Sequence, residues 1–257
     1  MKFSIITVAY NSETTIGATI ESVLRQDYAD IEYIIVDGKS TDNTVGIACK
    51  YIENFSGKLK IISEPDSGLY DAMNKGIRLS TGDIIGILNS DDCLATTTTV
   101  SKIASSIDAE TDGVYGDVNV ISRRGGSQGI RTISSKRFKP YMIRFGIAPP
   151  HPSFYIRRES YCKIGGYKSD YKISADFDLI VRMIRGGIRL KRLEECIVTM
   201  RNGGTSARGI RARLTSIREL KRACSENGIR TNTLLILSRF IYKAREFNLR
   251  NIITHGS

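Results

Sequence analysis

The chain has 257 residues, of which 41% are hydrophobic, and a formal net charge of +11. This length and composition allow one large α/β core, which excludes a disordered chain, and no apolar run approaches the ~20 residues of a membrane-spanning helix. Five widely spaced cysteines fit reduced thiols, and neither a disulfide framework nor a zinc knuckle.

The positive charge is concentrated near the C-terminus. Residues 201–257 hold twelve Lys or Arg and three Asp or Glu, which gives +9 and leaves +2 for the first 200 residues. A basic segment fits nucleic acid, anionic lipid or phosphorylated substrates, and it also fits a solvated helical face. Since a strand-like pattern begins at Phe3 without a preceding signal peptide, we expect a cytoplasmic protein.

Three strand–loop–helix units are expected at the start of the chain. Apolar and β-branched residues predict strands at 2–9, 31–36 and 59–62, and helical patterns follow at 14–26, from 41 to about 55, and at 70–79. A fourth, fully buried strand begins at Ile84 and runs into Asp91 and Asp92, with the next helix expected near Thr96. Strands that alternate with helices predict a parallel sheet covered by helices on both faces.

Polar side chains follow each of these strands at the point where it ends. They are Tyr10 and Asn11, Asp37, Asp66, and the pair Asp91 and Asp92. Because right-handed crossovers place these strand ends along one edge of the sheet, we expect the side chains to lie close together. Clustered carboxylates repel one another unless a cation neutralises them, so this edge predicts Mg²⁺ or Mn²⁺ and a nucleotide diphosphate. The alternative is that one aspartate of the pair only caps the next helix.

The pattern changes after residue 112. Residues 113–121 alternate as a strand does, and Arg123–Gly126 suggest a turn into a partner strand near 129–133, so we expect a mixed sheet in this half. His151 lies between two prolines in a segment that we expect to be extended. It is either a structural histidine or a group at the diphosphate or metal.

Two helical stretches are expected in the basic C-terminal part, at 210–225 and 233–247. The second has an apolar side that includes Leu234, Leu237 and Ile241, with basic residues on its other faces. Such a helix can lie in a membrane interface, where each basic residue near anionic lipid contributes about 1 kcal/mol. The alternative is that the apolar side packs on the rest of the protein or on a second subunit.

Nine short motifs are spread over the chain from residue 4 to residue 206. They are residues 4–11 (Ser-Ile-Ile-Thr-Val-Ala-Tyr-Asn), 36–44, 74–77, 81–83, 89–92 (Asn-Ser-Asp-Asp), 151–154, 165–167, 175–179 and 203–206. Together they resemble the family-two glycosyltransferases with the GT-A fold. This resemblance implies a Rossmann-like three-layer α/β/α fold with a mostly parallel central sheet and additional C-terminal helices. It assigns residues 1–206 to the glycosyltransferase domain and leaves 207–257 as a basic helical extension.

The resemblance implies an inverting, metal-dependent glycosyltransferase of bacterial surface polysaccharide synthesis. Its donor would be a nucleotide diphosphate sugar, expected to be UDP-linked, and its acceptor a glycan, expected to be lipid-linked. The expected partners are therefore the nucleotide sugar, the acceptor and a Mn²⁺ or Mg²⁺ ion, without nucleic acid. We expect contact with the inner face of the cytoplasmic membrane through the C-terminal helices.

Site residues follow from the same resemblance. Nucleoside binding falls to Thr7, Ala9, Tyr10, Asn11 and Asp37, with Asp66 beside them, and metal binding falls to Asp92, helped by Asp91, with His151 as a further candidate. One position departs from the family pattern. Many members carry a second aspartate after the one that matches Asp37, whereas this chain has Gly38 followed by Lys39. The identity of the nucleobase is therefore open.

A base for the transfer is expected near the start of a helix at Ser174. Inversion by direct displacement needs a carboxylate that takes the proton of the attacking hydroxyl. Asp176 aligns with Leu179 on the apolar side of that helix, whereas Asp178 aligns with its i,i+4 partner Arg182 on a more solvated face. The resemblance also puts the catalytic carboxylate at Asp176. A first-turn acidic residue is, however, favoured by the helix dipole without any catalytic role.

Two other functions are compatible with parts of the sequence. A nucleotidyltransferase would also need metal-binding carboxylates, but it would normally show a glycine- and lysine-rich loop where this chain has Tyr10-Asn11-Ser12. A basic nucleic-acid-binding protein would fit the net charge, but that charge lies in the tail and the aspartates would repel phosphates. The absence of a glycine-rich dinucleotide fingerprint and of a phosphate-binding loop disfavours NAD and P-loop chemistry.

Overall fold

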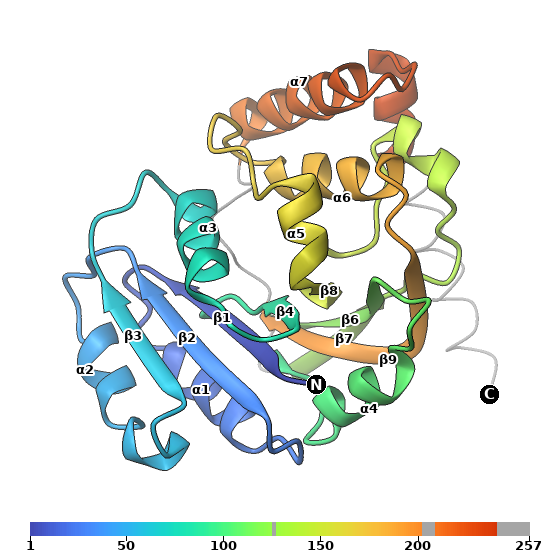
Figure 1. Ribbon diagram of the computed structural model, residues 1–257. Coiled ribbons are helices and arrows are strands. Elements are labelled where there is room, and N and C mark those ends of the chain that lie inside the picture. The colour runs from blue at the N-terminus through green and yellow to red at the C-terminus, as the bar shows by residue number, and fades with distance from the viewer. Residues whose placement is uncertain (125–126, 202–208, 241–257) are drawn as a thin grey trace.

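The computed structural model describes residues 1–124, 127–201 and 209–240 (Figure 1). The strands are β1 (Phe3–Ala9), β2 (Ile31–Asp37), β3 (Leu59–Ser63), β4 (Ile84–Ile87), β5 (Asp92–Leu94), β6 (Gly113–Arg124), β7 (Ser127–Ile133), β8 (Tyr155–Arg157) and β9 (Leu190–Arg201). The helices are α1 (Ile16–Leu24), α2 (Thr44–Cys49), α3 (Leu69–Leu79), α4 (Thr99–Ser106), α5 (Arg158–Ile164), α6 (Ala175–Arg185) and α7 (Ile210–Glu226), with short 3-10 turns η1 (Glu53–Phe55), η2 (Pro140–Phe145) and η3 (His151–Ser153). Within these ranges no helix is both long and apolar enough to span a bilayer.

The described strands form one nine-stranded sheet. Its order is β3-β2-β1-β4-β8-β6-β9-β5, and β7 pairs with β6. β1 to β4 are parallel to one another. Beyond β4 the sheet is mixed, because β8 is antiparallel to both β4 and β6, whereas β9 is parallel to β6. The predicted parallel first half and mixed second half are both confirmed.

Both faces of the sheet are buried under helices. In β1, Phe3 and Ile5 belong to one core, while Ile6 and Val8 belong to the other, as the alternation of strand side chains requires. The first core also takes in residues of α1, α2 and α4, and the second takes in residues of α3, α5, α6 and α7. Figure 1 shows the same three layers. β1, β2 and β4 are therefore buried at every position, which is why these stretches read as buried runs in the sequence.

Three local expectations were wrong. The second expected helix ends at Cys49 and is followed by the separate turn η1. The strand that begins at Ile84 ends at Ile87, and Asp92 opens the separate strand β5 after a turn in which Asp92 N donates to Asn89 O (3.0 Å). His151 opens a 3-10 turn instead of an extended segment.

The C-terminal helices are both packed and exposed. α7 is close to its predicted range, and residues 233–240 are helical, whereas residues 203–206 and 241–247 lie outside the described residues. Leu220, Ala223, Cys224 and Ile236 are buried in the core shared with α3 and α6. The exposed apolar residues of this part are Ile210, Leu214, Leu234, Leu237 and Phe240. Some apolar residues of this part are therefore packed against the rest of the protein, and others are exposed.

A buried carboxylate fastens the turn before β4 to the start of the sheet. Glu32 in β2 is 3% exposed and accepts hydrogen bonds from the Ser4 hydroxyl, from Thr81 Oγ1 (2.8 Å) and from Gly82 N (3.0 Å). Lys2 Nζ lies 3.3 Å from the same carboxylate. Burial alone raises the pKa of Glu32, but the hydrogen bonds from Ser4 and Thr81 outweigh it and lower the pKa to about 2.

We expect Glu32→Gln to lower the free energy of unfolding at pH 7 by roughly 2 to 3 kcal/mol, because the folded state binds the ionised form more tightly. A pKa lowered from 4.5 to about 2 gives stability that is present above pH 4.5 and is lost as the pH falls toward 2. Urea unfolding at several pH values from 7 to 2.5 measures this, with exposed Glu53→Gln as the control. Parallel stability curves for wild type and Glu32→Gln would contradict the assignment.

Candidate active site

The loops after β1, β2 and β3 converge at the carboxyl edge of the parallel strands. Gly38 N donates to Ala9 O (2.9 Å), which ties the second loop to the end of β1. A Cβ added at Gly38 would lie 2.5 Å from Asp66 Oδ2 and 3.5 Å from the Tyr10 ring. The structure therefore brings Tyr10 and Asp66 together around the glycine that departs from the family pattern.

Of the residues expected to hold a nucleoside, Tyr10 presents its side chain to solvent, with 63% exposed. Asn11 adopts a left-handed backbone (φ 48°) and is locked to the second loop, since its Oδ1 accepts from Thr41 N (2.9 Å). Thr7 is turned into the protein, where its hydroxyl bonds the Tyr33 hydroxyl (2.9 Å), and Ala9 is buried. Of these four residues, only Tyr10 and Asn11 are exposed.

Asp37 is fully buried and its carboxylate is already occupied. It accepts from Ser40 N (3.0 Å), from the Ser40 hydroxyl and from Ser63 Oγ (2.7 Å). These bonds hold the loop after β2 and join it to the end of β3. In this structure Asp37 orders the loops of the edge, and its oxygens do not face outward.

Asp92 is 1% exposed and has one carboxylate oxygen with a partner and one without. Its Oδ2 accepts from Asn89 Nδ2 (3.1 Å), whereas Asp92 Oδ1 and Asn89 Oδ1 are buried without a hydrogen-bond partner among the described residues. Two unsatisfied buried oxygens at one turn are costly unless a cation or donor meets them. This donor set, with the half-exposed Asp91 beside it, fits a hard divalent ion.

The charge of Asp92 is poorly compensated by protein groups. Burial, followed by the neighbouring charge of Asp91, raises the pKa of Asp92 to about 7, and hydrogen bonding from Asn89 and from the main chain of Arg201 only partly opposes this. A carboxyl with such a pKa gains most from a bound cation, because the ion removes both the repulsion and the unsatisfied oxygen.

His151 lies at the same edge of the sheet. β8 runs antiparallel to β4, with Tyr155 opposite Gly86, so the residues before Tyr155 lie beside the turn that follows β4. His151 Nε2 bonds the Tyr167 hydroxyl (2.5 Å). Within the described part of the chain, no group of three His, Cys, Asp or Glu side chains is placed to hold a metal, and no hydrogen bond joins His151 to Asp92. Metal binding by His151 stays a prediction.

Asp176 is half-buried in the first turn of α6, and His151 is near enough to affect its charge. Burial raises the pKa of Asp176, while His151 and the Phe177 N–H (2.8 Å from Oδ1) act in the opposite direction. Burial in turn lowers the pKa of His151 and favours its neutral form. An aspartate whose pKa is raised by burial is a suitable proton acceptor.

The expectation that Asp178 lies on a solvated face was wrong. Asp178 is fully buried, with Arg182 Nε at 2.7 Å, as the i,i+4 spacing predicted, and Lys168 Nζ at 3.1 Å. The reason is that α7 covers this side of α6 (Figure 1), so both faces of the helix are enclosed. Asp178 is therefore a structural ion pair.

Sequence reasoning missed several residues of this site. Tyr70 donates to Ile173 O, and its ring stacks on that of Tyr167 (centroids 5.8 Å apart), which in turn bonds His151. Asn89 stood in the Asn-Ser-Asp-Asp motif, which was the available signal, but its role needs the turn geometry. Tyr167 stood at the end of the motif at residues 165–167, whereas nothing in the sequence pattern singles out Tyr70.

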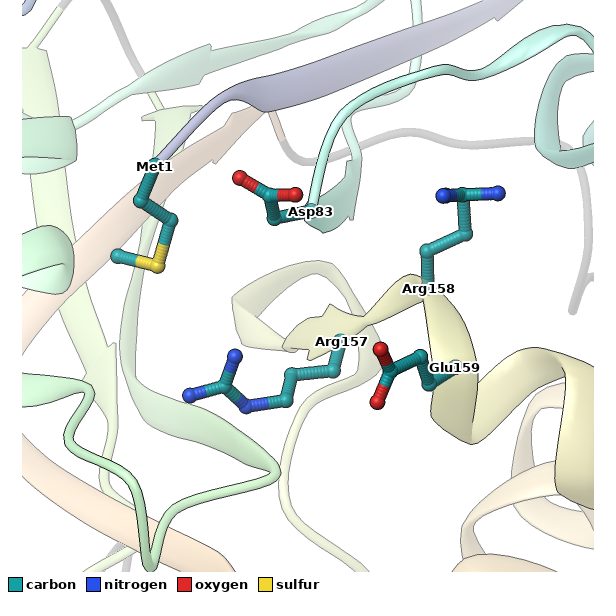
Figure 2. Close-up of a pocket in the computed structure, with 5 residues that line it drawn as sticks. All are labelled: Met1, Asp83, Arg157, Arg158 and Glu159. Carbon is teal, nitrogen blue, oxygen red and sulfur yellow. The ribbon is translucent and has the colours of Figure 1, made fainter.

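A separate hollow of about 220 Å³ lies at the opposite end of the strands, lined by Met1, Asp83, Arg157, Arg158 and Glu159 (Figure 2). Figure 2 shows the two arginines extending in different directions. Arg157 Nε donates to Thr111 O (2.8 Å) and Arg158 Nε to Gly82 O (3.2 Å). These arginines hold main chain, and the hollow is not part of the candidate site.

The three-layer fold, with a carboxylate-lined edge after its parallel strands, defines a nucleotide-sugar transferase of the GT-A type. Residues 4–165 match the family model described as glycosyl transferase family 2, and the chain belongs to this family. It is therefore a glycosyltransferase, as the sequence predicted.

Curated relatives extend the likeness. The chain is 34% identical over 208 residues to a PGL/p-HBAD biosynthesis glycosyltransferase of Mycobacterium bovis, covering 79% of this chain and 78% of the relative. It is 29% identical over 203 residues to the putative glycosyltransferase EpsE of Bacillus subtilis, covering 78% and 73%.

Solved structures share the fold at low sequence identity. The crystal structure of S. aureus TarS in complex with UDP-GlcNAc matches with a TM-score of 0.68 and 19% identity, over 87% of this chain and 66% of that chain. The mannosyltransferase PcManGT from Pyrobaculum calidifontis, in complex with GDP-Man and Mn²⁺, matches with a TM-score of 0.62 and 20% identity, over 88% and 63%. These matches establish the GT-A-like fold.

Proposed function

We propose that this protein is an inverting glycosyltransferase that moves a sugar from a UDP-linked donor to the hydroxyl of a glycan acceptor, with a divalent cation at Asp92. The observation that carries this proposal is the pair of buried, unpartnered oxygens of Asp92 and Asn89 at the carboxyl edge of the parallel strands. The TarS complex with UDP-GlcNAc and the PcManGT complex with GDP-Man and Mn²⁺ support the donor class.

The nucleoside is assigned to the first three loops. The exposed Tyr10 ring offers a face on which a base can stack, and Asp66 lies beside it across Gly38. Asn11 contributes the fixed backbone between them, while Thr7, Ala9 and Asp37 hold the loops from inside. Base recognition therefore rests on Tyr10 and Asp66 in this proposal.

The diphosphate is assigned to the turn after β4. Asp92 and Asn89 supply oxygens for Mn²⁺ or Mg²⁺, and Asp91 adds charge beside them. When bound, the ion neutralises the charge that develops on the departing diphosphate. Asn89 also fixes the orientation of Asp92 through its amide hydrogen bond.

Proton transfer is assigned to Asp176. In direct displacement the acceptor oxygen forms a bond to the anomeric carbon, the bond from that carbon to the diphosphate breaks, and Asp176 takes the hydroxyl proton. Attack on the face opposite the leaving group inverts the anomeric carbon. His151 is half-buried, is held by Tyr167 and lies near this carboxylate.

In this proposal the acceptor is presented at a membrane surface, to which the C-terminal helices bind. The C-terminal helices expose Ile210, Leu214 and Leu234, and α7 also carries basic residues, namely Arg211, Arg213, Arg218, Lys221 and Arg222. Apolar residues among basic ones suit the interface of an anionic membrane. A lipid-linked glycan acceptor on the cytoplasmic face of the membrane would then lie close to the site.

We expect the full chain to release UDP slowly from at least one sugar in a panel of nucleotide sugars, and only with Mn²⁺ or Mg²⁺. Asp92→Asn should lower this rate at least a hundredfold and abolish metal-dependent UDP binding, because an amide cannot compensate the cation. Asp91→Asn should be milder. Release that does not depend on metal, or full turnover by Asp92→Asn, would sink the assignment.

Asp176→Asn should leave UDP binding near normal and lower turnover at least a hundredfold, since general base catalysis typically contributes about 10² to 10⁴. Because the pKa of Asp176 is raised, the rate should fall on the acid side at a pH above the ordinary 3.8. Glu159→Gln, in the first turn of α5, controls for the loss of a helix-dipole contact. Equal losses in the two variants would remove the base assignment.

Vesicle sedimentation tests the membrane contact. We expect the full chain to bind phosphatidylglycerol vesicles and not phosphatidylcholine vesicles, with binding weakened at high salt. The double variant Leu214→Ser, Leu234→Ser should weaken binding at least tenfold, because each leucine contributes about 1.5 to 3 kcal/mol when buried. Ile130→Ser, at an exposed site on β7, should have no effect. Equal binding by both variants would contradict the contact.

A further inference from the structure

A carboxylate of α7 is buried against the segment that leads into α6. Glu219 is 8% exposed, and its two oxygens accept three consecutive main-chain N–H groups: Lys172 N (2.7 Å), Ile173 N (3.0 Å) and Ser174 N (2.8 Å). Within the described part of the chain, the hydrogen bonds that Glu219 accepts all come from this segment. Its buried charge is therefore compensated by this segment alone.

This segment determines where Asp176 lies. Ser174 is the residue before the first turn of α6, and its own side chain does not cap the helix. The first N–H groups of a helix, and those just before it, need an acceptor, and the positive end of the helix dipole favours a negative one. Glu219 supplies that acceptor from another helix, two residues before Asp176.

The segment is held from the opposite side as well. The Tyr70 hydroxyl of α3 donates to Ile173 O, and the Tyr70 ring stacks on Tyr167, the partner of His151. Glu219 thus binds the N–H groups of this segment, and Tyr70 binds one of its carbonyls. Figure 1 shows α7 lying across the outer side of α6, away from the sheet.

We propose that Glu219 is a positioning residue for sugar transfer, which fixes the start of α6 so that Asp176 is held in the site. This inference rests on the proposed role of Asp176. It makes α7 part of the catalytic unit, although α7 lies beyond the residues that match the family model. Glu219 itself touches neither donor nor acceptor.

The matched control lies on the same helix. Glu226 of α7 accepts from Lys168 Nζ (2.6 Å) and from the Tyr171 hydroxyl (3.2 Å), so it also joins α7 to the loop before α6. It binds side chains only and leaves the main chain of residues 172–174 untouched. If the substitutions acted only by loosening the packing of α7, Glu226→Gln and Glu219→Gln would lower activity alike. If Glu219 acts through the main chain of residues 172–174, only Glu219→Gln lowers it.

The test compares the full-length variants Glu219→Gln, Glu219→Ala, Glu226→Gln and Asp176→Asn. We expect hydrogen exchange of the amides of residues 172–174 to quicken at least tenfold in Glu219→Gln and not in Glu226→Gln. The kcat for metal-dependent UDP release should fall at least tenfold in Glu219→Gln and further in Glu219→Ala. The Kd for UDP with Mn²⁺ should stay within threefold of wild type. Should Glu219→Ala fail to fold, the glutamine variant decides.

Unchanged exchange or unchanged kcat in Glu219→Gln would overturn the inference, and so would equal losses of kcat in Glu226→Gln. If Asp176→Asn is inactive and UDP binding is intact in these cases, the proposed function stands and only the role of Glu219 fails. Wild-type turnover by Asp176→Asn would overturn the base assignment and the inference together.

Discussion

The burial of carboxylates is the constraint on which this structure depends, because a negative charge removed from water is costly unless donors or a cation compensate it. The buried acidic residues of the described chain are Glu32, Asp37, Asp92, Asp178 and Glu219. Each except Asp92 is compensated by protein groups, and each of those joins segments far apart in the sequence. Among these five residues, only Asp92 keeps a buried carboxylate oxygen without a hydrogen-bond partner, and it lies at the carboxyl edge of the parallel strands.

Hydrogen bonds also join the loops of the carboxyl edge to one another. Asp37 draws the loops after β2 and β3 together, and Asn11 fixes the loop after β1 against the second loop. The Ser12 hydroxyl then bonds the Ser90 hydroxyl (2.8 Å) in the turn that carries Asp92. Groups that are held before the ligand arrives need no reorganisation during the reaction, which is the main source of electrostatic catalysis.

The elements and their edge could be predicted from sequence because periodicity and strand-end position are local properties. Asp91 and Asp92 stood out in this way, but only the turn geometry makes Asp92 the buried member of the pair. The burial of Asp178 could not be predicted, since the solvation of a helix face depends on what covers it, and α7 follows about thirty residues later. The hydrogen bonds that Glu219 accepts come from main-chain N–H groups, which every residue type except proline has, so no sequence pattern indicates them.

Glu219 and the segment before α6 stabilise each other, and this affects where a domain boundary can be placed. Without residues 172–174 the carboxylate would be a buried, uncompensated charge, and without Glu219 those N–H groups would lack an acceptor. Leu220 and Cys224 of α7 are buried in the core that also contains α6, so removing α7 would expose apolar residues of that core. The match to the family model ends at residue 165, before both α6 and α7. A domain boundary after residue 206 would therefore cut the hydrogen bonds between Glu219 and the segment that precedes Asp176.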